Sequence, residues 1–189
     1  MKNTFVVSCP IDTYSGYGAR ARDFVKSLIE LDEYEVKIIP QRWGTTTEGF
    51  IANNSKKWGF LKKYISPQLT EKPDYWCQIT VPNEFSPVGK YNIGLTAGIE
   101  TTVCDGSWVE GCNRMDLILT SSEHSKRVFE TSQFYKDGDE NQIIKLEKPI
   151  KVLFEGADLD TFKVIKTFKN KDLKSSIDNI PEDYAFLMV

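Results

Sequence analysis

The sequence predicts an α/β protein with a Rossmann-like, doubly wound and mainly parallel sheet. Two observations carry this prediction: apolar runs of strand length recur along the chain, and segments of helical period separate them. A third is the length of 189 residues, which suffices for one domain with a hydrophobic core. Strands that alternate with helices favour a parallel sheet, because each crossover helix covers one of its faces.

The first forty residues predict a strand, a helix and a second strand. Residues 4–8 form an apolar run that is too short for a helix and typical of a buried parallel strand. Residues 18–31 have helical period, with one apolar and one polar side. The apolar side has Ala21, Phe24, Val25, Leu28 and Leu31, and the polar side has Arg22, Asp23, Lys26 and Glu30. Residues 34–39 alternate before Pro40, which completes a βαβ unit.

The middle of the chain continues the alternation. Residues 57–65 predict a short helix, and residues 75–81 and 91–96 predict two internal strands. A further short helix is expected around Trp108 and Cys112, followed by a strand at residues 116–120.

The last elements of the domain follow from a cap and a final apolar run. Ser121 and Ser122 are cap candidates for a helix that contains Val128 and Phe129. Residues 135–148 predict a solvated loop, and residues 150–154 predict the last strand of the series.

Charge and composition exclude several classes of protein. The chain has 24 Lys and Arg residues against 27 Asp and Glu, a net charge of −3, whereas a general nucleic-acid binder carries a basic stripe. It has no apolar run of the roughly 18 residues that a membrane-spanning helix needs, and no export signal. These observations predict a cytoplasmic protein without a transmembrane segment or a nucleic-acid partner.

The cysteines and the histidine predict no metal site. Cys9, Cys77, Cys104 and Cys112 include no C-x-x-C pair, and His124 is the only histidine. Scattered cysteines in a domain of this size are typical of buried, reduced thiols. We therefore expect neither a metal nor another resident cofactor.

A glycine turn is the first candidate site. Gly16, Tyr17 and Gly18 open the sequence G-x-G-x-x-A at the start of the first helix. At this place backbone N–H groups and the positive end of the helix favour a phosphate. Two interpretations are open: the glycines bind a phosphate group, or they serve only a tight turn.

A dinucleotide cofactor is one form of the phosphate interpretation. Six residues separate Cys9 from Gly16, whereas the dinucleotide fingerprint places its glycines directly after the strand. Arg42 follows the second strand and suits the 2′-phosphate of NADP rather than a ribose hydroxyl. An NADP-dependent oxidoreductase domain that uses Gly16, Gly18 and Arg42 is therefore one alternative function.

Glu100 and His124 are candidates on other loops. Glu100 follows the strand at residues 91–96, so it would lie at the carboxyl ends of the strands, where α/β proteins bind ligands. It is either a ligand-binding or a surface carboxylate. His124 lies in the first turn of a helix, whose dipole disfavours the imidazolium. It is either a partly buried neutral side chain or a hydrogen-bonding group toward a substrate.

Several pieces of the sequence, in order, resemble the N-terminal half of glycosyltransferase family 4, the group 1 glycosyltransferases of GT-B fold. The matching pieces are residues 15–18, residues 93–96 with Glu100 and Thr101, residues 108–116, residues 120–129, and residues 152–158 with Phe162. Together they cover about residues 4–162. The family has two Rossmann-like domains across a cleft and transfers a sugar from a nucleotide-sugar donor to an acceptor.

The resemblance implies a site. It places donor phosphates at Gly16, Tyr17 and Gly18. It places the acceptor side of the cleft at Glu100, Thr101, Ser121 and His124. It implies a hexosyltransferase that needs no metal, because N–H donors and a helix N-terminus can stabilise the departing nucleoside diphosphate.

The resemblance also divides the chain. Residues 1–165 would be the N-terminal domain, residues 166–183 a linker, and residues 184–189 the first strand of a C-terminal domain or an added edge strand. Most donor contacts in the family belong to the C-terminal domain, so we expect a truncated product or fragment with little turnover alone. Its partners would be a nucleotide sugar, an acceptor, and a C-terminal domain or a second chain. A noncatalytic, transferase-like interaction module is a further alternative.

Overall fold

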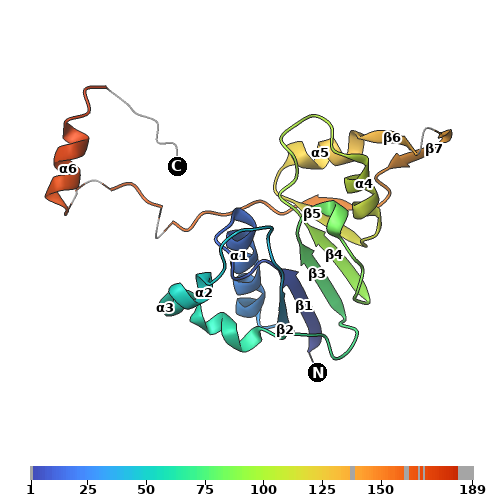
Figure 1. Ribbon diagram of the computed structural model, residues 1–189, viewed down its shortest axis with the longest axis horizontal. Coiled ribbons are helices and arrows are strands. Elements are labelled where there is room, and N and C mark those ends of the chain that lie inside the picture. Colours follow the sequence, from blue (N-terminus) through green and yellow to red (C-terminus); the bar gives the residue numbers. More distant parts are fainter. Residues whose placement is uncertain (1, 137–138, 160–161, 166, 168, 183–189) are drawn as a thin grey trace. The chain divides into compact units, whose positions relative to one another are not determined.

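The structure is a computed structural model that describes residues 2–136, 139–159, 162–165, 167 and 169–182 (Figure 1). The chain divides into two compact units, Met1–Glu155 and Gly156–Val189, and each is described by itself. Among the described residues, no helix combines the length and the apolar character that crossing a membrane requires.

The first unit alternates strands and helices, as predicted. Its first half contains β1 Asn3–Cys9, α1 Gly16–Leu31, β2 Tyr34–Pro40, α2 Phe50–Asn53, α3 Ser55–Trp58, the 3₁₀ helix η1 Gly59–Tyr64 and β3 Tyr75–Ile79. Its second half contains the 3₁₀ turn η2 Pro82–Glu84, β4 Tyr91–Leu95, α4 Gly106–Asn113, β5 Leu117–Thr120, α5 Glu123–Thr131, β6 Gln133–Lys136, β7 Asp139–Lys145 and β8 Ile150–Val152. The helix predicted at residues 57–65 forms as two short pieces, α3 and η1.

Six strands form one parallel sheet, which confirms the predicted α/β class with flanking helices. The order across the sheet is β2-β1-β3-β4-β5-β8, and every neighbouring pair is parallel. Beyond β2, Ile65 makes a single parallel bridge to Ile38, and the N–H of Ser66 donates to the Ile38 carbonyl at 2.8 Å. If this bridge counts as a residual strand, the order by chain position is 3-2-1-4-5-6-7, and its first six positions match the order of dinucleotide-binding folds.

Both faces of the sheet are covered. Along β1 the buried side chains alternate: Phe5, Val7 and Cys9 belong to one hydrophobic cluster and Val6 to the other. The first cluster includes side chains of α1, α2 and α3, and the second includes side chains of α4 and α5. A sheet buried on both faces has continuous apolar strands, which explains why the short apolar runs predicted the strands well.

The solvated loop predicted at residues 135–148 is wrong. β6 and β7 form an antiparallel hairpin there, with Phe134 paired to Ile144 and Tyr135 to Ile143. Phe134 and Ile144 pack against the second hydrophobic cluster. The hairpin is therefore held by apolar side chains that the charged tip of this segment concealed from the sequence analysis.

The second unit contains one described helix, α6 Lys171–Asp178. The Asn170 side chain caps it and accepts hydrogen bonds from the N–H groups of Asp172 and Leu173, at 3.0 and 3.1 Å. The helix lies within residues 166–183, the segment predicted as a linker. The first unit ends at Glu155, before the boundary predicted at residue 165. The strand predicted at residues 184–189 lies outside the described residues.

Candidate functional site

The loop from β1 to α1 is a tight turn that ends on a helix cap. The Ser15 hydroxyl accepts a hydrogen bond from the N–H of Gly18 at 2.9 Å. Gly18 is buried, and a Cβ there would lie 2.6 Å from both the carbonyl oxygen and Oγ1 of Thr13. Gly16 is exposed, and a Cβ there would meet no atom within 4 Å. Gly18 thus packs the turn, whereas Gly16 leaves the start of the helix accessible.

Alanine at these two positions should therefore have opposite outcomes. Gly18→Ala is expected to destabilise the domain by about 2 kcal/mol, because its methyl group would overlap a carbonyl oxygen in a packed turn. Gly16→Ala is expected to change the free energy of unfolding by less than about 0.5 kcal/mol. Urea denaturation of both variants measures the difference. Equal stabilities would show that the turn relaxes without cost.

Arg22 holds the same loop from beneath, although the sequence analysis placed it on the polar side of the helix. This side chain is 3% exposed. Its Nη1 donates to the carbonyl oxygens of Ile11 and Thr13 at 3.0 and 2.9 Å, and its guanidinium lies 3.5 Å over the Phe50 ring. Burial lowers the pKa of Arg22. The guanidinium fits this site because loop carbonyls and an aromatic face replace its water.

Tyr17 joins the glycine turn to the loop after β4. Its hydroxyl is 3.0 Å from Thr96 Oγ1 and accepts a hydrogen bond from the N–H of Ala97 at 3.1 Å. Its ring stacks on Trp43, in the loop after β2, with ring centroids 4.1 Å apart and planes at 26°. Three loops at the carboxyl ends of parallel strands therefore meet at one side chain. From the sequence, Tyr17 is predicted only as part of the phosphate turn, and Trp43 is not among the predicted site residues.

Removing the Tyr17 hydroxyl should weaken this junction. Tyr17→Phe is expected to cost about 1 kcal/mol, because it loses two hydrogen bonds in a partly buried site while the stacked ring remains. The free energy of unfolding in urea checks this. Tyr91→Phe is the matched control, since no hydrogen bond is described for the exposed Tyr91 hydroxyl. A loss of equal size in the control would contradict the role of the Tyr17 hydroxyl.

A cavity of about 390 Å³ lies beside this junction, between the loop after β4 and the start of α5. Its lining includes three of the predicted residues, Glu100, Ser121 and His124, together with Ala97, Ile99, Ser122 and Ser125. Ser121 Oγ donates to the carbonyl oxygen of Ala97 at 2.7 Å. Ser122 caps α5, and its hydroxyl accepts from the N–H of Ser125 at 3.1 Å. The polar lining of the cavity therefore consists of serine hydroxyls and an imidazole at the start of α5 and a carboxylate in the loop after β4.

His124 lines this cavity and contacts Thr101, a predicted site residue that is not part of the lining. Nε2 of His124 is 3.2 Å from the carbonyl oxygen of Thr101, which requires a proton on Nε2. The predicted alternative of a partly buried histidine is wrong, because the His124 side chain is exposed. Thr101 Oγ1 donates to the carbonyl oxygen of Val103 at 2.8 Å. The Thr101 backbone thus contacts His124, and the Thr101 hydroxyl shapes the loop. Glu100 is exposed, and no partner is described for its carboxylate.

The loop after β4 reaches this shape through Gly98, which the sequence analysis did not single out. Gly98 has a φ of +93°, a conformation that L side chains rarely adopt. A Cβ there would overlap the Ser125 side chain and lie 2.8 Å from Thr120 Oγ1. The N–H of the next residue, Ile99, donates to Ser125 Oγ at 3.3 Å. Gly98 therefore lets the backbone of the loop pack closely against Ser125 in the first turn of α5.

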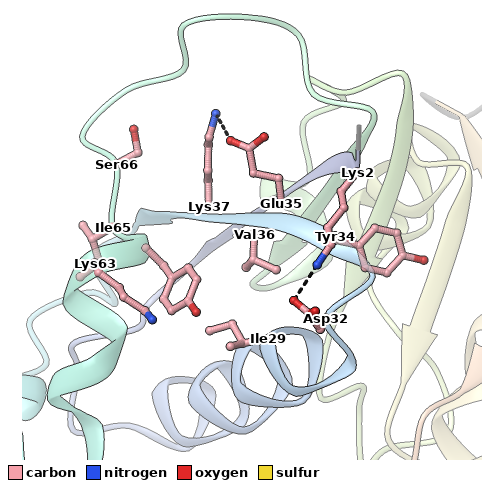
Figure 2. A pocket seen from close by; sticks show the side chains of 11 residues that line it. Lys2, Ile29, Asp32, Tyr34, Glu35, Val36, Lys37, Lys63, Ile65 and Ser66 are labelled. Carbon is pink, nitrogen blue, oxygen red and sulfur yellow. Dashed lines mark hydrogen bonds and ion pairs between the residues drawn. The ribbon is translucent and has the colours of Figure 1, made fainter.

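A larger cavity, of about 660 Å³, lies elsewhere. It follows the outer edge of β2 (Figure 2). Four of its five charged side chains pair with one another: Lys2 Nζ lies 2.6 Å from Asp32, and Lys37 Nζ lies 3.1 Å from Glu35 (Figure 2). None of the predicted site residues lines it. Ligands of doubly wound sheets bind at the carboxyl ends of the strands, so we base the candidate site on the smaller cavity.

The NADP alternative depends on Arg42. Its side chain is 83% exposed, and Nε lies 3.8 Å from Glu48 Oε1. A carboxylate beside this guanidinium would repel a 2′-phosphate. Within the described part of the chain, no group of three or more His, Cys, Asp or Glu residues is placed to hold a metal ion.

Comparisons of the chain with family models, with curated proteins and with solved structures find no match.

Proposed function

We propose that this chain is the acceptor-side half of a glycosyltransferase, which transfers a hexose from a nucleotide sugar to an acceptor. The proposal rests on the ordered resemblance to glycosyltransferase family 4. The structural observation that carries it is the junction at Tyr17, whose hydroxyl ties the glycine turn to the loop that lines the 390 Å³ cavity. A phosphate-binding turn and an acceptor cavity on one edge of a sheet are the two parts that such a transfer needs.

The donor phosphates would bind at the start of α1. Ser15 is the cap residue, so Gly16 and Tyr17 are the first two residues of the helix, and their N–H groups have no partner within it. Gly16 is exposed and leaves room for a phosphate oxygen. Negative charge develops on the departing nucleoside diphosphate, and fixed N–H donors at the positive end of a helix stabilise it.

The acceptor would occupy the cavity at the start of α5. Its volume of about 390 Å³ lies in the range of small-molecule sites. Glu100 is the carboxylate in the cavity lining. It can accept a hydrogen bond from an acceptor hydroxyl and take up the proton that this hydroxyl loses. Ser121 and His124 offer further polar groups. By the resemblance, the remaining donor contacts belong to a second α/β domain.

A proline substitution tests the phosphate site without a change of shape. Proline is favoured at the first position of a helix and lacks the N–H, and Ser15 before it has the extended conformation that precedes proline (φ −126°, ψ 164°). Gly16→Pro should therefore fold and weaken nucleotide-sugar binding by about tenfold, the effect of one charge-assisted hydrogen bond. Gly16→Ala keeps the N–H and should bind as the unmodified chain does.

Isothermal titration of the full chain with UDP-glucose and GDP-mannose measures these affinities, and a melting experiment with NADPH is run beside it. Binding of a nucleotide sugar that Gly16→Pro weakens and Gly16→Ala preserves supports the proposal. Stabilisation by NADPH without any response to nucleotide sugars would favour the oxidoreductase alternative. An obligate complex with another chain, seen by light scattering, without nucleotide-sugar binding would favour the noncatalytic module.

A further inference from the structure

Trp43 is a half-buried aromatic side chain at the carboxyl edge of the sheet, three residues after the end of β2. Tyr17 stacks on the indole, and no second aromatic ring or cation of the described residues lies against it. No described hydrogen bond uses the indole N–H. Tryptophan is enriched at binding surfaces, because its ring offers a large contact area while its N–H can stay in water.

The indole is held by its stack on Tyr17, and the backbone that carries it is held by a turn. Tyr17 is itself fixed by its hydrogen bonds to Thr96 and Ala97. The Trp43 carbonyl accepts a hydrogen bond from the N–H of Thr46 at 2.9 Å, which closes a turn. A ring that is already immobile loses little conformational entropy when a ligand stacks on it.

The loop that carries Trp43 is also tied to the glycine turn. The N–H of Tyr14 donates to the carbonyl oxygen of Thr47 at 3.0 Å. The Asp12 carboxylate accepts from the N–H groups of Gly49 and Ile51, at 3.2 and 2.7 Å. These hydrogen bonds join the two loops and so restrict the position of Trp43 relative to the start of α1.

The surroundings of Trp43 fit a polyhydroxylated ring. Arg42 directly precedes Trp43 in the sequence and pairs with Glu48, and both have exposed charged groups that can hydrogen-bond hydroxyls. The electron-rich face of an indole attracts the C–H groups on the apolar face of a sugar ring. We propose that Trp43 is a stacking platform for a pyranose ring, so that the acceptor is a saccharide that extends past Tyr17 from the cavity at the start of α5. Tyr17 joins the two places, because its ring stacks on Trp43 and its hydroxyl accepts from the N–H of Ala97 in the cavity lining. The proposal rests on the proposed function, whose acceptor side it specifies.

The test uses the full chain and a panel of methyl glycosides of glucose, galactose and mannose, with maltose and cellobiose, and uridine and adenosine as the comparison arm. Ligand-observed saturation-transfer NMR and titration calorimetry measure binding to the unmodified chain and to two variants. Trp43→Ala removes the platform, whereas Trp43→Phe keeps an aromatic face. We expect at least one saccharide to bind, Trp43→Ala to weaken it by about tenfold, and Trp43→Phe to retain it within about threefold.

Tryptophan fluorescence supplies an independent readout of the same event. Saccharide binding should change the emission of the unmodified chain and of Trp108→Phe, but not of Trp43→Phe. Trp108 is a suitable control because it is also half-buried, and it stacks on Phe129 in the other hydrophobic cluster. Far-UV circular dichroism and thermal melting establish that every variant is folded.

The outcomes separate the two proposals. No saccharide binding, binding that Trp43→Ala leaves unchanged, or stacking of a nucleoside in place of a sugar would each overturn the role of Trp43. Saccharide binding that depends on Trp43, together with no effect of Gly16→Pro on any nucleotide sugar, would keep this inference and overturn the proposed transfer.

Discussion

Gly111→Ala is expected to destabilise the first unit by about 3 kcal/mol or more, the largest effect of any alanine substitution that we predict. Gly111 is buried on α4, where the helix meets the 3₁₀ turn η2. A Cβ at this position would overlap the carbonyl oxygen of Pro82 and lie 3.1 Å from the backbone nitrogen of Asn83. Backbone atoms cannot rotate away as a side chain can, so helix and turn would have to separate.

The separation would also break two hydrogen bonds. Arg114, at the end of α4, donates from Nε to the carbonyl oxygen of Phe85 and from Nη2 to that of Asn83, both at 2.8 Å. Urea denaturation checks the prediction, with Gly59→Ala as the matched control. Gly59 has helical φ and ψ of −59° and −24°, and a Cβ there would have only ordinary contacts. The control should be neutral or slightly stabilising. Equal stability of the two variants would contradict the close approach of α4 and η2.

Alkaline pH is expected to destabilise the domain steeply, through its buried thiols. Burial raises the pKa of Cys9 and Cys77 far above the ordinary value, and raises that of Cys112 to about 12. All four cysteines are buried and unpaired, as predicted. In the folded state these thiols stay protonated, whereas in the unfolded chain they ionise near pH 9. The unfolded state therefore binds fewer protons above pH 9, and stability falls as the pH rises.

The size of this effect follows from linkage. Each such thiol lowers the free energy of unfolding by about 1.4 kcal/mol per pH unit above its unfolded pKa, so three thiols give about 4 kcal/mol per unit. The contribution of the protonated buried thiols to stability is complete below pH 9. It is lost as the pH rises from about 9 to about 12 and beyond. Urea denaturation over a pH series measures the slope. Cys77→Ala should lower this slope by about 1.4 kcal/mol per pH unit, whatever the variant costs at neutral pH. Identical slopes would show that Cys77 is not held neutral by the fold.

The sequence predicted the sheet well because burial on both faces gives each strand its own apolar run. The strands predicted at residues 4–8 and 91–96 are examples, because residues 5–8 and 92–96 are all buried. Loops and hairpins lack such a signal. The pairing of Phe134 with Ile144 spans a charged tip, and only the position of the second hydrophobic cluster makes that hairpin favourable.

The site was predictable only in part, for a similar reason. Glu100, Ser121 and His124 line one cavity because the rule that ligands bind at the carboxyl ends of strands already selects their loops. The same rule would have selected Trp43, but its contact with Tyr17 joins residues 26 positions apart. Arg22 was misplaced because charge alone predicts exposure. Its carbonyl partners lie in an irregular loop that no periodicity describes.

Ile65 pairs with β2 through a single bridge, so most of the outer edge of β2 has no described partner strand. Since Ile38 directs its carbonyl outward to Ser66, the alternation of the strand also directs the backbone groups of Val36 outward, where no described strand receives them. Unpaired N–H and C=O groups on such an edge can pair with a strand of another chain. The ion pair of Lys37 with Glu35 lies on this edge, and charged side chains there discourage such pairing. The two residues would then oppose aggregation through this edge, a role separate from the candidate site at the carboxyl ends of the strands.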